Sequence, residues 1–291
     1  MARIPYPSDL TDAEYARVAP LLPLPSRRGR PRVHPWRARL DGMFYLVRTG
    51  CQWRALPREC PPWRTVDHYF RRWRVDGTWA RLHAALRTAV RSALGRDPQP
   101  SGGIVDAQSV KTTSVGGPRG YAGGKKVSGR KRHLLVDTLG LVLRADVHTA
   151  DLQERATVPR LLAGAAREFP RLHKVWADQG STGSGRAWSE RELGWHVEVV
   201  QHPPTGRGGF RGIPDPTMPY GVRIVRVPAR KMRGFRGPLP RRWVVERTFA
   251  WLLHGRRFAR AYARLPATDE ALIYAAMTRL MLRRLVRYSE R

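Results

Sequence analysis

The fold is decided by the stretch Ile104-Val105-Asp106-Ala107-Gln108-Ser109-Val110, a short apolar strand interrupted by one acidic residue. Before it the pattern of apolar residues is helical, and after it the pattern becomes strand-like. The segment just ahead of this strand, residues 96–103, is rich in proline and glycine, which favours a domain boundary. We therefore predict a helical domain over residues 1–97 and an α/β domain over residues 98–291.

The α/β domain shows a definite order of strands and helices. Three strands come first, the second and third joined by a hairpin through Thr138-Leu139-Gly140, and strands then alternate with helices. The strands after the first are predicted at 133–137, 141–147, 173–178 and 195–201. Residues 202–239, rich in proline, glycine and arginine, are predicted to be an insertion with one strand-like piece at 222–227. This order is that of a ribonuclease H-like core, an α/β fold with a mixed five-stranded sheet and helices on both faces.

Three acidic residues stand at matching points of this arrangement. Asp106 lies midway along the first strand, Asp178 ends the fourth, and Glu246 lies in the first turns of the final core helix. The middle of strand one lies beside strand four in such a sheet, so the three carboxylates can converge. Three hard oxygen ligands suit Mg²⁺ or Mn²⁺, and two such ions about 4 Å apart can promote in-line displacement at a phosphodiester. Taken singly, Asp106 also fits an edge residue, and Asp178 fits a helix cap.

The setting of Glu246 is the helical stretch Pro240-Arg241-Arg242-Trp243-Val244-Val245-Glu246-Arg247-Thr248-Phe249-Ala250-Trp251-Leu252-Leu253. At 3.6 residues per turn Glu246 falls on the side of Trp243 and Phe249, so we expect an acid embedded in an apolar stripe. Such a carboxylate is costly unless a cation meets it, and the nearby candidates are Arg242, Arg247, Arg256 and Arg257. The alternative is a surface i,i+4 ion pair between Arg242 and Glu246.

The composition points to a polyanionic partner. The formal net charge is +31, and a compact body with this charge repels itself, so nucleic acid is the expected ligand. The glycine-rich segment 116–132 matches neither a Walker A motif nor a GxGxxG spacing, so no nucleotide cofactor is expected. We predict that it is a mobile loop whose basic residues contact a phosphate backbone: Lys125, Lys126, Arg130, Lys131 and Arg132.

The N-terminal part reads as a set of helices with basic outer sides. A helix at 37–48 stops at Gly50, and another covers 63–74 with Val66, Phe70 and Trp73 facing inward. The basic residues of this second helix are Arg64, Arg71, Arg72 and Arg74. Two helices across a short connection with a basic second helix are typical of a helix-turn-helix DNA reader. An ordinary helical bundle with a charged exterior is the alternative.

The two cysteines, Cys51 and Cys60, fit neither a zinc ribbon nor a disulfide framework. No apolar run approaches the length of a membrane span, and no apolar signal core begins the chain. We expect a soluble cytoplasmic protein that is associated with the nucleoid when it binds DNA.

Several motifs along the chain carry a family resemblance. They are Gly50-Cys51-Gln52-Trp53-Arg54-Ala55-Leu56-Pro57, Pro62-Trp63-Arg64-Thr65-Val66, Val105-Asp106-Ala107-Gln108-Ser109-Val110-Lys111, Gly129-Arg130-Lys131-Arg132-His133, Ala177-Asp178-Gln179-Gly180 and Arg242-Trp243-Val244-Val245-Glu246-Arg247-Thr248-Phe249-Ala250-Trp251. As an ordered set they resemble bacterial insertion-sequence transposases of the DDE type, in the family-five group. The resemblance implies that Asp106, Asp178 and Glu246 form a catalytic triad with two divalent ions. It also implies that the N-terminal helices help to recognise the terminal inverted repeats.

The sequence departs from the superfamily pattern near Glu246. Many relatives carry a tyrosine seven residues before this glutamate and a basic residue seven after it, where this chain has Leu239 and Leu253. Arg242, four residues before, is present and is the favoured phosphate contact. We expect a homodimer on double-stranded DNA, because two element ends must be brought together before joining to target DNA. A catalytically silent DNA-binding protein and a metal-dependent nuclease without strand transfer are the two alternatives.

Overall fold

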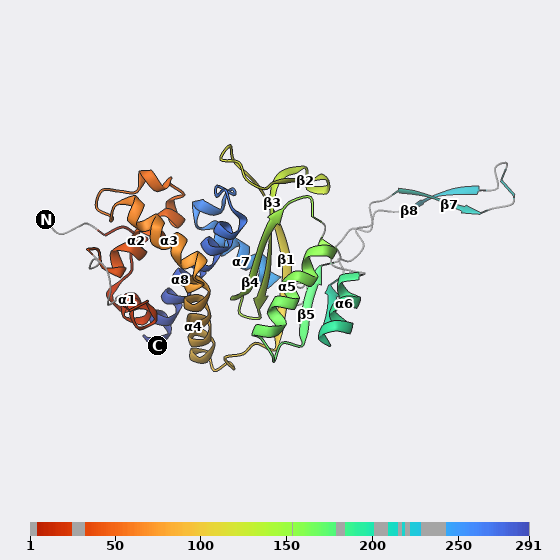
Figure 1. Cartoon of the computed structure of the whole chain (residues 1–291). Coiled ribbons are helices and arrows are strands. Elements are labelled where there is room, and N and C mark those ends of the chain that lie inside the picture. Colours follow the sequence, from red (N-terminus) through yellow and green to blue (C-terminus); the bar gives the residue numbers. More distant parts are fainter. Residues whose placement is uncertain are drawn as a thin grey trace.

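A six-stranded mixed sheet forms the centre of the computed structural model, which describes residues 5–24, 33–152, 154–178, 184–200, 209–214, 217–218, 222–227 and 243–290. The strand order is β2-β3-β1-β5-β6, and β4 also pairs with β3 (Figure 1). The strands are β1 (Gly102–Lys111), β2 (Gly120–Ala122), β3 (Val127–Asp137), β4 (Val142–Thr149), β5 (Lys174–Asp178) and β6 (His196–Val200).

The pairing of these strands confirms the predicted mixed topology. β1 runs antiparallel to β3, from Gly103 opposite Asp137 to Lys111 opposite Gly129, and parallel to β5. β3 and β4 form the antiparallel hairpin, while β5 and β6 are parallel and are connected by a helix. A parallel pair needs such a crossover, whereas an antiparallel pair needs only a turn.

Helices cover both faces of the sheet, as the sequence predicted (Figure 1). α5 (Glu154–Glu168) lies on one face, where Leu161 packs with Val105 and Leu135, and α6 (Ser184–Leu193) packs against α5 and β6. α7 (Trp243–Leu253) and α8 (Pro266–Ser289) lie on the opposite face, where Ile104 and Val136 enter a second core. Alternation along β1 and β3 thus assigns their successive apolar residues to one core and then the other.

The N-terminal helices join the core on the α7 and α8 face. They are α1 (Asp12–Val18), α2 (Trp36–Thr49), α3 (Trp63–Val75) and α4 (Thr78–Ala93), with short 3₁₀ turns at Ala19–Leu21 (η1) and Trp53–Ala55 (η2). α4 packs along α8, and Leu82, Ile273 and Val136 belong to one continuous apolar cluster. The division of the chain at residue 97 stays a prediction, because this core extends across it.

The connection between α2 and α3 differs from the predicted short turn. It runs from Gly50, which ends α2 in the left-handed conformation with φ +73, to Pro62, and it contains η2. A helix-turn-helix has a turn of about three to four residues. Prolines at 57, 61 and 62 keep this longer segment from joining either helix. α3 still presents the predicted inward side chains Val66, Phe70 and Trp73.

The strand β2 and the first part of β3 lie where a basic loop was expected. β2 pairs with the start of β3, across the 3₁₀ turn Gly123–Lys125 (η3), so the sheet has one strand more than predicted. β3 begins at Val127 rather than at His133, and this earlier start converts most of the expected basic loop into sheet. Within the insertion, β8 (Val222–Val227) is the predicted strand-like piece and pairs with β7 (Gly209–Pro214).

Over the described residues, no helix combines the length and the apolar character of a membrane span.

Candidate active site

Asp106 and Asp178 occupy the same level of neighbouring parallel strands. Ile104 of β1 is paired in register with Trp176 of β5, and each aspartate follows its pair member by two residues. Residues two apart belong to the same face of a sheet, so positions 106 and 178 lie on the face of Ile104 and Trp176. Asp106 is half-buried, and one of its carboxylate oxygens accepts a hydrogen bond of 2.7 Å from the Ala107 amide. The Asp178 side chain is outside the described part of the chain.

α7 packs on this same face and carries Glu246 in its first turn. Its buried side, which includes Val245 and Phe249, shares the core cluster with Ile104 and Trp176. The prediction that Glu246 is embedded in an apolar stripe is wrong, because Glu246 is exposed. The helix is rotated so that Val244, Val245, Thr248, Phe249 and Leu252 face the sheet, which leaves the stripe of Trp243, Glu246 and Leu253 facing outward.

A chain of polar contacts fixes α7 on the β3–β4 turn. The Thr248 hydroxyl donates to the Gly140 carbonyl at 2.8 Å, and the Arg247 guanidinium donates to the Leu139 carbonyl at 3.1 Å. The turn itself is held by the buried Asp137 carboxylate, which accepts the Leu139 and Leu141 amides and pairs with Arg91 of α4. The position of Glu246 therefore depends on the hairpin turn and, through Arg91, on the N-terminal helices.

Gly140 is the tightest point of this contact. Its φ is +81, and a Cβ added there would lie 2.8 Å from Cζ3 of Trp251 and 2.9 Å from the Thr248 hydroxyl. We expect Gly140→Ala to lower the free energy of unfolding by about 2 kcal/mol through strain and overpacking, and to lower activity by displacing α7. The control is Gly95→Ala, which has the same kind of backbone, φ +64, with nothing within 4 Å. Denaturant unfolding and DNA cleavage of both variants check this, and equal effects would show that contact with α7 is unimportant.

The carboxylates at this site are of the type that holds hard divalent cations. Asp106 and Glu246 are both accessible to solvent, and position 178 lies on the same face of the sheet. Among the described residues, no three His, Cys, Asp or Glu side chains are close enough to share a metal ion. Because the Asp178 side chain is outside that set, the predicted three-carboxylate site stays a prediction. The oxygen-only donor set fits Mg²⁺ or Mn²⁺.

The basic residues of β3 are structural, which corrects their predicted role as phosphate contacts. Arg130 is fully buried; its guanidinium contacts Asp269 at 2.8 Å and the carbonyls of Ala263 and Arg264, both at 2.6 Å. Arg132 is also buried and donates to the Phe258 carbonyl at 2.9 Å. Both arginines therefore hold the connection between α7 and α8. The sequence predicted them in a loop because the strand was expected to begin at His133, whereas β3 begins at Val127.

The other buried basic groups are likewise turned to protein acceptors. The Lys131 ammonium donates to the Leu152 carbonyl at 2.8 Å, on the α5 face. Arg257 lies in the 3₁₀ turn Arg256–Phe258 (η5), is buried, and donates to the Cys51 carbonyl at 3.1 Å, which again differs from its predicted role. His133, which ends the same motif as Arg130 and Lys131, is neutral because burial lowers its pKa to about 3. The four buried side chains Arg130, Lys131, Arg132 and Arg257 are therefore not presented to an external polyanion.

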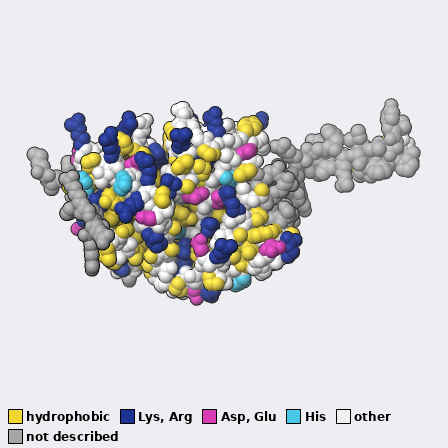
Figure 2. Space-filling model, in the orientation of Figure 1, with side chains coloured by type: hydrophobic (Ala, Val, Ile, Leu, Met, Phe, Trp, Pro, Cys, Tyr) yellow, Lys and Arg dark blue, Asp and Glu magenta, His cyan; other side chains and the backbone are white. Residues whose placement is uncertain are grey.

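The remaining predicted contacts fall into three groups. The side chains exposed on the surface are Arg64, Arg71, Arg72, Lys125, Lys126 and Arg256. Two are half-buried: Arg74 of α3, and Arg247, which stacks between the rings of Trp243 and Trp251. Arg242 lies outside the described residues. On the face shown in Figure 2, Lys and Arg side chains are dense over the N-terminal helices at the left.

Lys125 is an exposed cation that contacts β1 next to Asp106. It ends η3, and its ammonium lies 3.5 Å from the carbonyl of Ala107, the residue after Asp106.

α3 borders a separate cleft of about 1100 Å³ that it shares with the segment before α8, and the lining includes Arg71, Trp63 and Tyr262. Basic and aromatic side chains thus border both the carboxylates and the junction of the two halves.

Comparison with known proteins identifies the family. Residues 10–83 match a family model described as "transposase of IS4/5 family", and residues 97–282 match the model "Transposase DDE domain". The chain is also 34% identical over 114 residues to the "Insertion element IS402 uncharacterized 16.2 kDa protein" of Burkholderia cepacia. That alignment covers 37% of this chain and 76% of the relative. The DDE model spans more than half of the chain and all six strands of the sheet, so the chain belongs to the DDE transposases of insertion sequences.

Proposed function

We propose that this transposase cuts DNA at the ends of its insertion sequence and joins the freed 3′-hydroxyl to a target strand. The observation that carries the proposal is the register of β1 and β5, which sets positions 106 and 178 at one level of the sheet face covered by α7. Glu246 lies on the exposed side of that helix, where a DNA strand can reach it. No covalent link between protein and DNA is needed, because the attacking group is a hydroxyl.

Asp106, Asp178 and Glu246 would hold two Mg²⁺ or Mn²⁺ ions, which when bound would activate the attacking hydroxyl and stabilise the leaving oxygen. The chain itself positions the phosphate. Lys125, held beside Ala107, supplies a cation next to β1 that can bind a phosphate oxygen. The exposed arginines of α3 supply further phosphate contacts at a distance from the carboxylates.

Joining two element ends requires two active sites on one DNA assembly. We therefore propose a homodimer formed on double-stranded DNA, in which the N-terminal helices read the terminal inverted repeats. α3, with exposed Arg64, Arg71 and Arg72, is the best candidate for the reading helix. Acting on chromosomal DNA would place the protein at the nucleoid.

A joining assay tests the proposed function. The substrate is a labelled duplex copied from the DNA that borders the gene, ending at a pre-cut 3′-hydroxyl, and the target is a supercoiled plasmid. With Mg²⁺ we expect labelled plasmid products, because the hydroxyl attacks a target phosphodiester. Free ends released from an uncut substrate without any joined product would instead indicate a nuclease. Binding without nicking or joining would indicate a catalytically silent DNA-binding protein.

A further inference from the structure

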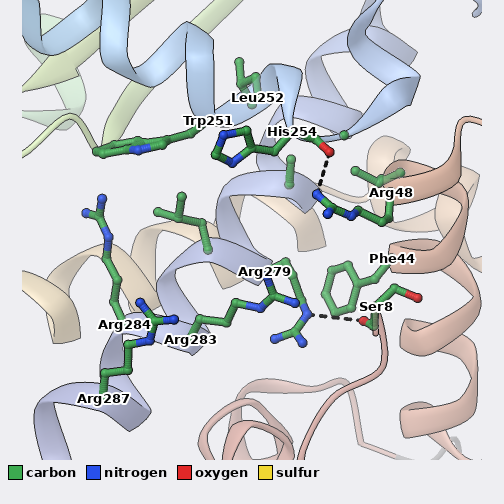
Figure 3. Close-up of a pocket in the computed structure, with 14 residues that line it drawn as sticks. Ser8, Phe44, Arg48, Trp251, Leu252, His254, Arg279, Arg283, Arg284 and Arg287 are labelled. Atoms are coloured by element: carbon green, nitrogen blue, oxygen red, sulfur yellow. Dashed lines mark hydrogen bonds between the residues drawn. The ribbon is translucent and has the colours of Figure 1, made fainter. Parts of the chain in front are cut away.

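A pocket of about 430 Å³ lies where α2, the C-terminal end of α7 and α8 meet (Figure 3). Its apolar lining residues include Phe44, Leu252 and Leu280. Its charged lining residues are all basic side chains: Arg48, Arg279, Arg283, Arg284 and Arg287. Within the described part of the chain, this concentration of guanidinium groups has no role in the carboxylate site proposed above.

The arginines of the pocket differ in how far the protein uses them. Arg279 is turned to the protein, since its guanidinium donates to the Asp9 carbonyl at 2.7 Å and pairs with Glu14 at 2.5 Å. Arg48 donates to the His254 carbonyl at 2.7 Å. Arg283 donates to the Pro7 carbonyl at 3.0 Å, its Nε lies 4.0 Å from a Glu14 carboxylate oxygen, and half of its side chain is exposed. Arg287 also lines the pocket and is exposed (Figure 3).

The charge in the pocket exceeds what the protein balances. Burial lowers the pKa of Arg283, and repulsion from Arg279, Arg48 and Arg287 lowers it further, whereas Glu14 alone raises it. Glu14 is itself held in the Arg279 ion pair and is buried. Mutual repulsion of this kind costs stability unless an anion binds. Arginine forks in a half-buried position are well suited to a phosphodiester.

The pocket is connected to Glu246 through α7. The Arg284 guanidinium lies 4.3 Å from the centre of the Trp251 ring, and the Arg247 guanidinium lies 4.6 Å from it. Arg247 also stacks on Trp243, at 4.4 Å, so rings and guanidinium groups alternate from the first turn of α7 to the pocket. Trp251 thus contacts two guanidinium groups, which favours contact with the DNA backbone over stacking on a base.

The spacing of Glu246 and Trp251 along α7 indicates which phosphate would reach the pocket on a DNA strand that follows this helix. Trp251 lies five residues after Glu246, which is about 7 to 8 Å at about 1.5 Å per residue. One DNA strand advances about 3.4 Å per nucleotide. We infer that the pocket binds a phosphodiester about two to four nucleotides from the scissile bond, on the strand that enters the active site. This inference rests on the proposed role of Glu246, and it names Arg283, Arg284 and Arg287 as DNA contacts.

DNA binding without chemistry provides the test. In a Glu246→Gln background with EDTA, the affinity for a labelled 30-base-pair duplex of random sequence is measured over a range of KCl concentrations. We expect Arg283→Gln with Arg287→Gln to reduce the slope of log affinity against log salt by about two, and the affinity at 0.1 M salt by about 10- to 100-fold. The matched control is Arg186→Gln with Arg191→Gln, which removes the same charge from α6 on the other side of the sheet.

Equal slopes for the two double variants would overturn the inference. Loss of poly-glutamate binding in the pocket variant, with an unchanged DNA slope, would show that the pocket receives an acidic protein segment instead. Arg287→Gln alone guards against misfolding, because Arg287 is exposed, and it is expected to give about half of the slope change. This test measures binding and not cleavage, so its outcome is separate from that of the joining assay. A protein that binds DNA through this pocket but never cuts would disprove the proposed function and still support the inference about the pocket.

A second measurement locates the contact. A single neutral methylphosphonate is moved along the pre-cut element-end duplex described above. Wild type is expected to lose affinity when the substitution lies about two to four nucleotides from the reacting end. The Arg283 and Arg287 double variant is expected to bind the duplex substituted at those positions as tightly as it binds the unsubstituted duplex. Equal sensitivity of both proteins at those positions would place the contact elsewhere.

Discussion

Asp106→Asn is expected to reduce the rate of DNA cleavage by about 10³-fold or more, and Glu246→Gln is expected to do the same. Each amide keeps the size of the side chain but removes the charge that would hold a divalent cation against the reacting phosphate. A loss of this size corresponds to about 4 kcal/mol of transition-state stabilisation. The measurement is single-turnover cleavage of the element-end duplex with Mg²⁺, and Asp178→Asn belongs in the same series.

The combined variant separates a shared site from three independent acids. If the carboxylates act on the same ions, Asp106→Asn with Glu246→Gln cuts no more slowly than either single variant. Affinity for DNA in EDTA is expected to stay the same or to rise, because a negative charge facing phosphate is lost. Glu190→Gln, which removes an exposed acid paired with Arg186 on α6, is the control and should cut like wild type. Cleavage by the Asp106 and Glu246 variants at the wild-type rate would remove these residues from the site.

The sequence predicted those elements whose apolar period is unambiguous. β1 and β5 were recognisable because one acid interrupts or ends a short apolar run, and that recognition put positions 106 and 178 side by side. α3 was recognisable because Val66, Phe70 and Trp73 recur at helical spacing. In each case local side-chain chemistry and burial agree, so a single sequence carries the information.

Other features could not be predicted because distant partners decide them. The first half of β3 reads as a basic loop, and it is a strand because its backbone pairs with β1, β2 and β4. Its arginines are accommodated because Arg130 and Arg132 meet main-chain carbonyls before α8 and Arg130 meets the Asp269 carboxylate. The available signal was the two-residue period that puts Arg130 and Arg132 on the same face as Leu134 and Val136. The rotation of α7 was predicted wrongly for a similar reason, since Thr248 counts as polar by composition but is buried on the Gly140 carbonyl. No local pattern reveals that α4 packs along α8.

Arg130→Gln is expected to lower the free energy of unfolding by about 3 to 5 kcal/mol at neutral pH. The substitution leaves the Asp269 carboxylate buried without its closest ion-pair partner and removes donors from the carbonyls of Ala263 and Arg264. The control is Arg72→Gln, whose partner Asp76 lies 3.8 Å away in an exposed pair, and a change of at most about 1 kcal/mol is expected there. Denaturant unfolding of both variants provides the comparison.

The loss caused by Arg130→Gln should depend on pH in a direction that the buried acid fixes. Burial raises the pKa of Asp269 in the folded protein, while Arg132 and Arg130 oppose that rise, so removing Arg130 raises this pKa further. An acid whose pKa is raised by folding costs nothing below its unfolded pKa, where it is protonated in both states, and the cost grows as the pH rises through the folded pKa. The deficit of Arg130→Gln should therefore be smallest below about pH 4 and should increase towards neutrality. A deficit that does not change with pH would mean that Arg132 and Arg257 compensate Asp269 without Arg130, and the variant would then lose only its carbonyl contacts.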